Sequence, residues 1–137
     1  DFIVGFPGES DQDFEQTMRI AEQIKYINSY SFKYSPRPHT AAALMPNQIP
    51  ESIKSARLAK LDATLNEIQR DFNESCIGKT LSCLYESADK TGRHLVYRTP
   101  YMQQCIVARP DDNSTPILAN IEITAANKAS LRGKFVK

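Results

Sequence analysis

The sequence has no long hydrophobic run and no recognisable export signal. It contains no stretch of about 18 apolar residues, so no membrane-spanning helix is expected. It starts at Asp1, immediately before an apolar strand pattern, and not with a methionine. This start predicts a fragment of a longer protein. Because the long apolar run is missing, no membrane partner is expected.

Cysteine is also scarce. The spacing of Cys76, Cys83 and Cys105 matches no zinc or iron–sulfur signature, so no metal site is expected in this chain. An odd number of thiols without an export signal favours reduced cysteines in the cytoplasm. Cys83 and Cys105 lie in apolar strand patterns and are interpreted as small core residues.

Neither sign of charge dominates the whole chain, but its two parts differ. With 137 residues, 41% of them hydrophobic and 24% charged, it can form one soluble domain or two small ones. Residues 1–77 hold 8 Lys/Arg and 11 Asp/Glu, a net −3, whereas residues 78–137 hold 9 and 5, a net +4. The basic part is compatible with a polyanionic partner, although most surpluses of this size are ordinary solvated surface.

The first part has the pattern of a strand, a helix and a second strand. The apolar run Phe2–Val4 enters a turn at residues 5–8, and Ser10 then caps a helix predicted over residues 11–26. The alternating aromatic segment 30–34 predicts the second strand, parallel to the first. The proline-containing loop 35–41 should therefore lie at the same edge as the turn, where ligands of such units bind. Many such turns bind nothing, so from the residues alone both possibilities stay open.

After residue 50, the pattern is first helical and then, from about residue 80, that of strands. A helix of about 25 residues is predicted from Glu51 to Ser75, with an apolar stripe along one side. Five short strands follow, expected at residues 80–86, 94–98, 102–108, 117–124 and 132–136. Short strands separated by polar turns are typical of a small closed barrel similar to the OB-fold.

Two segments of the first part resemble a known family. DFIVGFPGES followed by DxDFExT, and later YSPRP with Thr40-Ala41, are similar to the end of the radical S-adenosylmethionine domain of methylthiotransferases. The resemblance implies an adenosylmethionine pocket that includes Ile3, Gly5, Phe6 and Gly8. It also places Arg37 at the mouth of that site, where it could contact a carboxylate or phosphate. His39 stands where the family usually has glycine, and Ala42 where it often has proline.

The second part resembles the TRAM domain, an RNA-binding barrel at the C-terminus of methylthiotransferases. The resemblance is carried by Gly78-Lys79-Thr80, by the RTPYxQ segment at residues 98–103 and by Ser130-Leu131-Arg132-Gly133. It implies RNA contacts by Arg98, Tyr101, Arg132 and Lys134, which offer cations for phosphates and an aromatic ring for stacking. Arg98 and Tyr101 also flank a proline turn and could simply hold that turn.

The resemblance implies a larger enzyme, of which this chain supplies only the last portion. The family holds one [4Fe–4S] cluster on a CxxxCxxC motif and a second on further cysteines, and this chain has neither set. We therefore expect no catalytic residue here and no activity of the fragment alone. FNES…GKT and RTPYxQ favour the subfamily that attaches a methylthio group to C2 of a modified adenosine beside the tRNA anticodon. The expected partner is the anticodon stem-loop, with an unknown sulfur donor and a monomeric protein.

The expected fold is an α/β fragment followed by a small all-β barrel. Residues 1–50 would be the C-terminal βαβ portion of a radical S-adenosylmethionine partial barrel, 51–77 a linking helix and 78–137 an OB-like TRAM barrel. Two alternatives remain: an RNA-binding module without catalysis, and a methylthiotransferase that acts on a ribosomal protein. RNA binding that does not depend on salt would favour the protein substrate, because phosphate contacts make affinity fall with salt.

Overall fold

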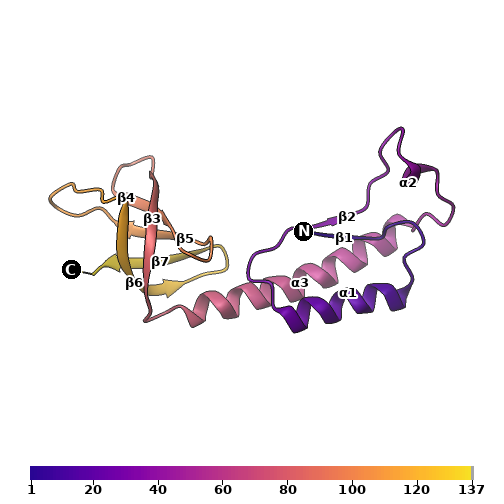
Figure 1. The fold of residues 1–137 in the computed structure, drawn as a ribbon, viewed down its shortest axis with the longest axis horizontal. Helices are drawn as coiled ribbons and strands as arrows, with labels where there is room; N and C mark the ends of the chain where they lie inside the picture. Colours follow the sequence, from indigo (N-terminus) through magenta and orange to yellow (C-terminus); the bar gives the residue numbers. More distant parts are fainter. Residues whose placement is uncertain (137) are drawn as a thin grey trace. The chain divides into compact units, whose positions relative to one another are not determined.

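The computed structural model describes residues 1–136, which form two compact units, Asp1–Ile68 and Gln69–Lys137 (Figure 1). The division falls inside one long helix, α3 (Glu51–Ser75), whose bounds agree with the prediction. The predicted limits of the functional domains, at residues 50 and 77, remain predictions. Within residues 1–136, no helix has the length and apolarity that crossing a bilayer requires.

The first unit contains a parallel pair of strands connected through a helix. It comprises β1 (Phe2–Val4), α1 (Asp11–Ile24), β2 (Ser31–Lys33), α2 (Ala41–Leu44) and the first part of α3. In the pair, Phe2 lies opposite Ser31 and Val4 opposite Lys33, so both strands end at the same edge. This arrangement confirms the predicted parallel pairing.

Helices cover one face of this two-stranded sheet and leave the other face bare. The core consists of buried side chains from β1, α1 and α3: Val4, Phe14, Met18, Ala21, Leu61 and Leu65. Figure 1 shows α1 and α3 on the same side of β1 and β2. On the opposite face the register partners Ile3 and Phe32 are 60% and 53% exposed. Because the sheet is buried on a single face, some apolar residues of these short strands lie outside the core.

Local capping explains where the short helices begin and end. Ser10 and Asp13 form the predicted capping box at the start of α1, and Lys25 ends it with a left-handed φ of 56°. The prediction missed α2, which begins because the Thr40 side chain accepts a hydrogen bond from the Ala43 amide. Just before it, His39 has a φ of 64°, a conformation that glycine adopts more readily.

The second unit is a closed five-stranded barrel, as predicted. Its strands are β3 (Thr80–Ala88), β4 (His94–Arg98), β5 (Gln104–Ala108), β6 (Leu118–Ala126) and β7 (Ser130–Phe135), in the order β3-β4-β5-β7-β6. The β5–β7 pair is parallel and the other pairs are antiparallel. The observed strand ends differ from the prediction by up to two residues, because backbone pairing in the barrel, and not side-chain alternation, determines where each strand stops.

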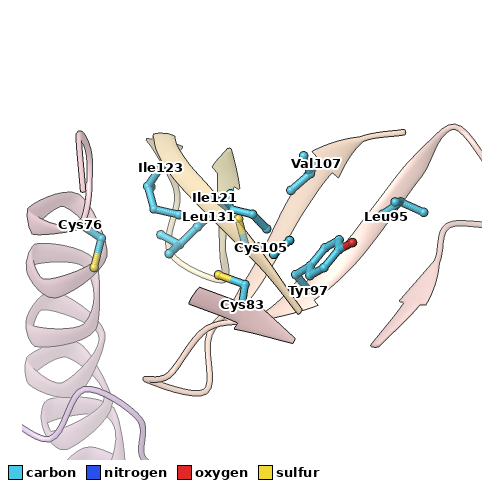
Figure 2. Close-up of a cluster of buried hydrophobic side chains, with 10 residues drawn as sticks. Cys76, Cys83, Leu95, Tyr97, Cys105, Val107, Ile121, Ile123 and Leu131 are labelled. Carbon is cyan, nitrogen blue, oxygen red and sulfur yellow. The ribbon is translucent and has the colours of Figure 1, made fainter. Parts of the chain in front are cut away.

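Side chains from all five strands fill the interior of the barrel (Figure 2). Tyr97 is fully buried at its centre, and its hydroxyl donates to the Pro116 carbonyl oxygen at 2.8 Å. The rings of Tyr85 and Phe135 contact it edge to face, each with its centroid 5.7 Å away. Burying the ring while pairing its hydroxyl gives the barrel a large apolar contribution without an unsatisfied polar group.

Barrel closure also depends on a glycine in β7. A side chain at Gly133 would collide with Ile121, and its Cβ would lie 2.8 Å from the Glu122 carbonyl oxygen and 3.3 Å from Cys105 Sγ. The pairing of β6 with β7 also shifts register between Ile123 and Ala125. Such irregularities and glycines let strands bend enough to close a small barrel.

Candidate ligand turn and candidate RNA-binding face

A buried arginine of α3 stabilises the turn after β1 through Glu9. The Gly5 amide donates to Glu9 Oε1 at 2.9 Å, and the same oxygen lies 2.6 Å from Arg57 Nη1. Arg57, from α3, also bonds Asp11 Oδ1 at 2.7 Å and is only 7% exposed. Burial works to lower the Arg57 pKa, but the hydrogen bonds to Asp11 and Glu9 outweigh it and raise the pKa, so the guanidinium stays charged. The ion pairs therefore fix the shape of the turn.

The two glycines of this turn have different surroundings. Both have left-handed backbones, with φ of 74° at Gly5 and 86° at Gly8. A side chain at Gly5 would collide with the aliphatic stem of Lys54, whose ammonium donates to the Tyr34 carbonyl oxygen at 3.1 Å. Among residues 1–136, and apart from Gly8 and its two chain neighbours, no atom lies within 4 Å of the corresponding point at Gly8. The Gly8 amide donates to the Asn47 carbonyl oxygen at 2.9 Å. The chain's own packing thus requires glycine at residue 5, whereas the space beside the Gly8 Cα is open to a ligand.

An open apolar surface adjoins the turn. Ile3 is 60% and Phe6 45% exposed, and the Phe6 ring lies edge to face against Tyr34 with centroids 5.3 Å apart. The Tyr34 hydroxyl is shielded from solvent and has no hydrogen-bond partner within residues 1–136. Exposed apolar side chains beside an accessible glycine backbone can accept a flat heterocycle such as adenine.

Arg37 follows the end of β2, at the same edge as the turn. The Tyr34 amide donates to the Val4 carbonyl oxygen at 2.8 Å, which joins the two strand ends. The Arg37 carbonyl oxygen accepts from the Thr40 hydroxyl at 2.8 Å, while its guanidinium bonds no other residue among 1–136. The loop backbone is held and the cation is free, but a ligand contact by Arg37 stays a prediction.

In the barrel, the predicted RNA-contacting cations share one outward surface. Arg98 on β4 lies opposite Gln104 on β5, and Gln104 lies opposite Ser130 on β7. Two residues further along these strands, Ile106 on β5 lies opposite Arg132 on β7. Their sequence neighbours Tyr97, Cys105, Leu131 point into the core, so alternation directs Arg98 and Arg132 outward. Two strand spacings and two residues separate them, about 12 Å along the sheet, and the curvature of the closed barrel spreads their outward side chains further apart. Lys134 continues the same row on β7. We call the outward surface of β4, β5 and β7 the basic face.

The cations of the basic face differ in what already binds them. Arg98 pairs with Glu86 and donates to the Met102 carbonyl oxygen at 2.9 Å. Lys134 Nζ lies 3.2 Å from Glu122 Oε2. The Arg132 guanidinium has no such partner within the described part of the chain. Arg132 is therefore the most available cation, and Arg98 also braces the β4–β5 loop.

Sequence reasoning missed a group of buried polar residues next to Tyr101. Tyr101 is 43% exposed, and its ring lies edge to face on Phe72 of α3, with centroids 5.1 Å apart. Behind this loop, Asn73 and Gln103 are almost fully buried and hydrogen-bonded to each other at 2.6 Å. In the sequence, Asn73 stands out only as part of the FNES segment and Gln103 only as part of the RTPYxQ segment, and neither segment shows that the two side chains meet.

Cys83 and Cys105 are core residues, as predicted, and Cys76 belongs to the same core. All three are reduced and buried. Burial raises the pKa of the Cys83 thiol to about 11 and that of Cys105 to about 12, so neither is a thiolate near neutral pH. Within residues 1–136, no group of three or more His, Cys, Asp or Glu side chains could hold a metal ion. The residues present do not fit an iron–sulfur cluster.

Comparison with known proteins gives close relatives along nearly the whole chain. The tRNA-2-methylthio-N(6)-dimethylallyladenosine synthase of Wolbachia pipientis subsp. Culex pipiens (strain wPip) is 46% identical over 136 residues. The same-named protein of Wolbachia pipientis wMel is 41% identical, and that of Rickettsia canadensis (strain McKiel) 45%. These matches cover 97%, 97% and 98% of this chain. No model of a known protein family matches it.

The chain spans only about 30% of the length of these curated relatives. The names agree with the resemblance that the GFPGES, YSPRP and RTPYxQ segments carry, and with the observed small barrel. Over 97% of its length, this chain is a homologue of tRNA-2-methylthio-N(6)-dimethylallyladenosine synthases, and the match is consistent with the C-terminal part of such an enzyme.

Proposed function

We propose that this chain is the RNA-binding portion of a tRNA methylthiotransferase and that it also completes the adenosylmethionine pocket of that enzyme. The substrate would be an N6-dimethylallyl-adenosine beside the anticodon, methylthiolated at C2, in the cytoplasm and by a monomeric enzyme. The observation that carries the proposal is the basic face, where Arg98 projects from β4 and Arg132 and Lys134 from β7, on either side of β5, in a barrel homologous to part of named tRNA-modifying enzymes.

The barrel suits RNA because it offers both cations and an exposed ring, and Arg98 donates to the loop that carries this ring, Tyr101. Within residues 1–136, Arg132 has no carboxylate partner. The ion pair of Lys134 with Glu122 is exposed, so little free energy is lost when a phosphate replaces Glu122. Tyr101 offers a partly exposed ring to an unpaired base. The net +4 charge of residues 78–137 adds attraction for RNA that is independent of its sequence.

The turn after β1 fits one side of an adenosylmethionine site. The open space beside Gly8 and the exposed side chains of Ile3 and Phe6 can receive the adenine, and Gly5 allows the turn to form. Arg37 can receive the carboxylate from the loop after β2. When bound, the cofactor supplies radical chemistry that can replace an unactivated C–H bond by C–S.

The residues of this chain would bind and orient the cofactor and the RNA, and none of them is assigned a step in which a bond forms or breaks. The cysteines do not fit an iron–sulfur cluster, so the cluster ligands would belong to other parts of a longer polypeptide. Residues 1–137 alone are therefore expected to transfer no methylthio group.

A chimera tests the proposal directly. The matching 136 residues of the wPip relative are replaced by this chain, and the chimera is expressed in a host that lacks its own methylthiotransferase. The proposal predicts methylthiolated adenosine in tRNA, detected by mass spectrometry of nucleosides. Changing Arg132 and Lys134 together to glutamine should lower that yield, with Arg19→Gln on α1 as a matched control.

The result would also separate the alternatives. A chimera that folds and retains its cofactors but leaves tRNA unmodified would contradict the proposal. Modification of a ribosomal protein in place of tRNA would favour the protein-directed alternative. Salt-sensitive RNA binding by this chain, together with an inactive chimera, would favour an RNA-binding module without catalysis.

A further inference from the structure

Three uncharged polar side chains are buried where α3 meets the barrel. Thr99, Asn73 and Gln103 are 2%, 1% and 8% exposed. Burying amide and hydroxyl groups is unfavourable unless each finds a partner, so a buried group of this kind needs an explanation. Here the three side chains bond one another and the backbone of two loops.

Asn73 connects these two loops. Its Nδ2 donates to the carbonyl oxygens of Asn127 at 2.9 Å and Lys128 at 3.3 Å, both in the β6–β7 turn. Its Oδ1 accepts from Gln103 Nε2 at 2.6 Å, at the end of the β4–β5 loop. One side chain at the end of α3 thus fixes both loops to each other.

The same bonds hold the β4–β5 loop, residues 99–103, in one shape. Gln103 Oε1 accepts from the Thr99 hydroxyl at 2.9 Å, and the Thr99 oxygen in turn accepts from the amides of Tyr101 and Gln103, each at 3.2 Å. Met102 has a left-handed φ of 67° and is 60% exposed. With Phe72 against its ring, Tyr101 has little freedom to turn away.

From this geometry we infer that loop 99–103 is a preorganised stacking platform for an unpaired RNA base, with Asn73 and Gln103 as its positioning residues. The inference rests on the proposed RNA binding by the barrel and deepens it. Tyr101 would stack on the base, while Asn73 and Gln103 touch no RNA. A ring that is already in place loses less conformational freedom on binding, which strengthens the complex.

Three variants of the full 137-residue chain test the inference. Tyr101→Ala removes the ring, and Asn73→Ala and Gln103→Met remove the bonds that position it. Val107→Ala is the control, because Val107 is 2% exposed in the core and pairs in register with Leu95 and Gly133, away from this loop. It reports what a general loss of barrel stability does to binding.

The probe is a short RNA stem-loop with 2-aminopurine in its loop, since stacking on an aromatic ring quenches the fluorescence of this base. Wild type and Val107→Ala should quench it. Tyr101→Ala, Asn73→Ala and Gln103→Met should lose the quenching and bind about tenfold more weakly, the loss of roughly one stacked base. The slope of log Kd against log salt should not change in these variants, because no phosphate contact is lost. Thermal melting establishes that each variant is folded at the assay temperature.

Full quenching by Asn73→Ala and Gln103→Met, or by Tyr101→Ala, would overturn the inference. Weaker binding by Val107→Ala to the same degree would do so too, because the effect would then follow stability alone. If Asn73→Ala fails to fold, Gln103→Met and the surface change Tyr101→Ala decide the outcome. If the wild type binds no RNA, both the proposed function and this inference are wrong. If the wild type binds the RNA but does not quench the 2-aminopurine fluorescence, only the stacking platform is wrong.

Discussion

The two units of this chain differ in whether their sheets have free edges. In the barrel, every strand from β3 to β7 has a neighbour on both sides, and nine buried residues of these strands form the core together with Cys76 (Figure 2). Within residues 1–136, β1 and β2 pair only with each other, and a core of six buried residues lies between one face of this sheet and its helices. A closed barrel needs no further strands, whereas a two-stranded sheet with a bare face is marginal by itself.

The difference also appears in what holds each unit together. The barrel depends on apolar side chains around Tyr97, a ring that only a closed sheet can surround. The first unit depends more on a buried ion pair, Arg57 with Glu9, which connects α3 to the turn after β1. Apolar packing is cooperative across the barrel, whereas the ion pair makes the first unit sensitive to a single change.

The largest expected effect is in the first unit. Arg57→Ala would leave the largely buried Glu9 carboxylate without its cation, with only the Gly5 amide bonded to it, and should destabilise that unit by about 3 kcal/mol. Urea unfolding followed by far-UV circular dichroism would report the loss of helix. Hydrogen exchange would show amides of β4 and β5 still protected, and adding Glu9→Gln should restore part of the loss. Equal loss of protection in the barrel would show that the two units do not differ in this way.

A smaller effect is expected in the barrel. Gly133→Ala places a methyl group against Ile121 and the Glu122 carbonyl oxygen, and should cost about 2 kcal/mol. The barrel transition in urea, followed by near-UV tyrosine dichroism, would measure it. Gly8→Ala is the matched control, because residue 8 has open space and only its φ of 86° opposes a side chain, at a cost of about 1 kcal/mol. A Gly133→Ala effect below that of Gly8→Ala would argue against tight barrel closure.

The smallest expected effect is a gain in stability. His39→Gly relieves the left-handed backbone at φ 64° and should stabilise the first unit by about 0.5 kcal/mol, since glycine's greater freedom when unfolded offsets part of the relief. The urea midpoint of that unit should rise. Asn47→Gly, at the same φ, should change less because asparagine tolerates this conformation better. A lower midpoint for His39→Gly would mean that the imidazole has a stabilising role.

Periodicity and turn residues predicted most of the fold, because side-chain patterns report directly on burial. The alternation in HLVYR gave β4 its bounds, and the 25-residue stripe gave α3 its bounds. The helix α2 was missed because four residues are too few to show a period, and only the Thr40 cap signals it. Strand ends such as Ser130 in β7 depend on a neighbour far away in sequence, Gln104.

The candidate sites were only partly visible in the sequence. Residue types suggested Arg98, Arg132 and Lys134, and the register then placed them on the basic face. Glu86 pairs with Arg98 and Glu122 pairs with Lys134. No local sequence pattern reveals these two contacts, because the partners lie on different strands. Nor could the sequence show that Gly5 is required by Lys54, or that Asn73 joins two loops.

The most direct test of the account is the salt dependence of RNA binding, measured with the full chain and a short stem-loop between about 50 and 200 mM salt. The basic face predicts that log Kd rises steeply with log salt. Arg132→Gln should reduce that slope by about 0.7, the share of one phosphate contact to single-stranded RNA. Arg19→Gln, an exposed arginine on α1, should leave the slope as it is. A slope near zero, or one that Arg19 governs and Arg132 does not, would contradict the account.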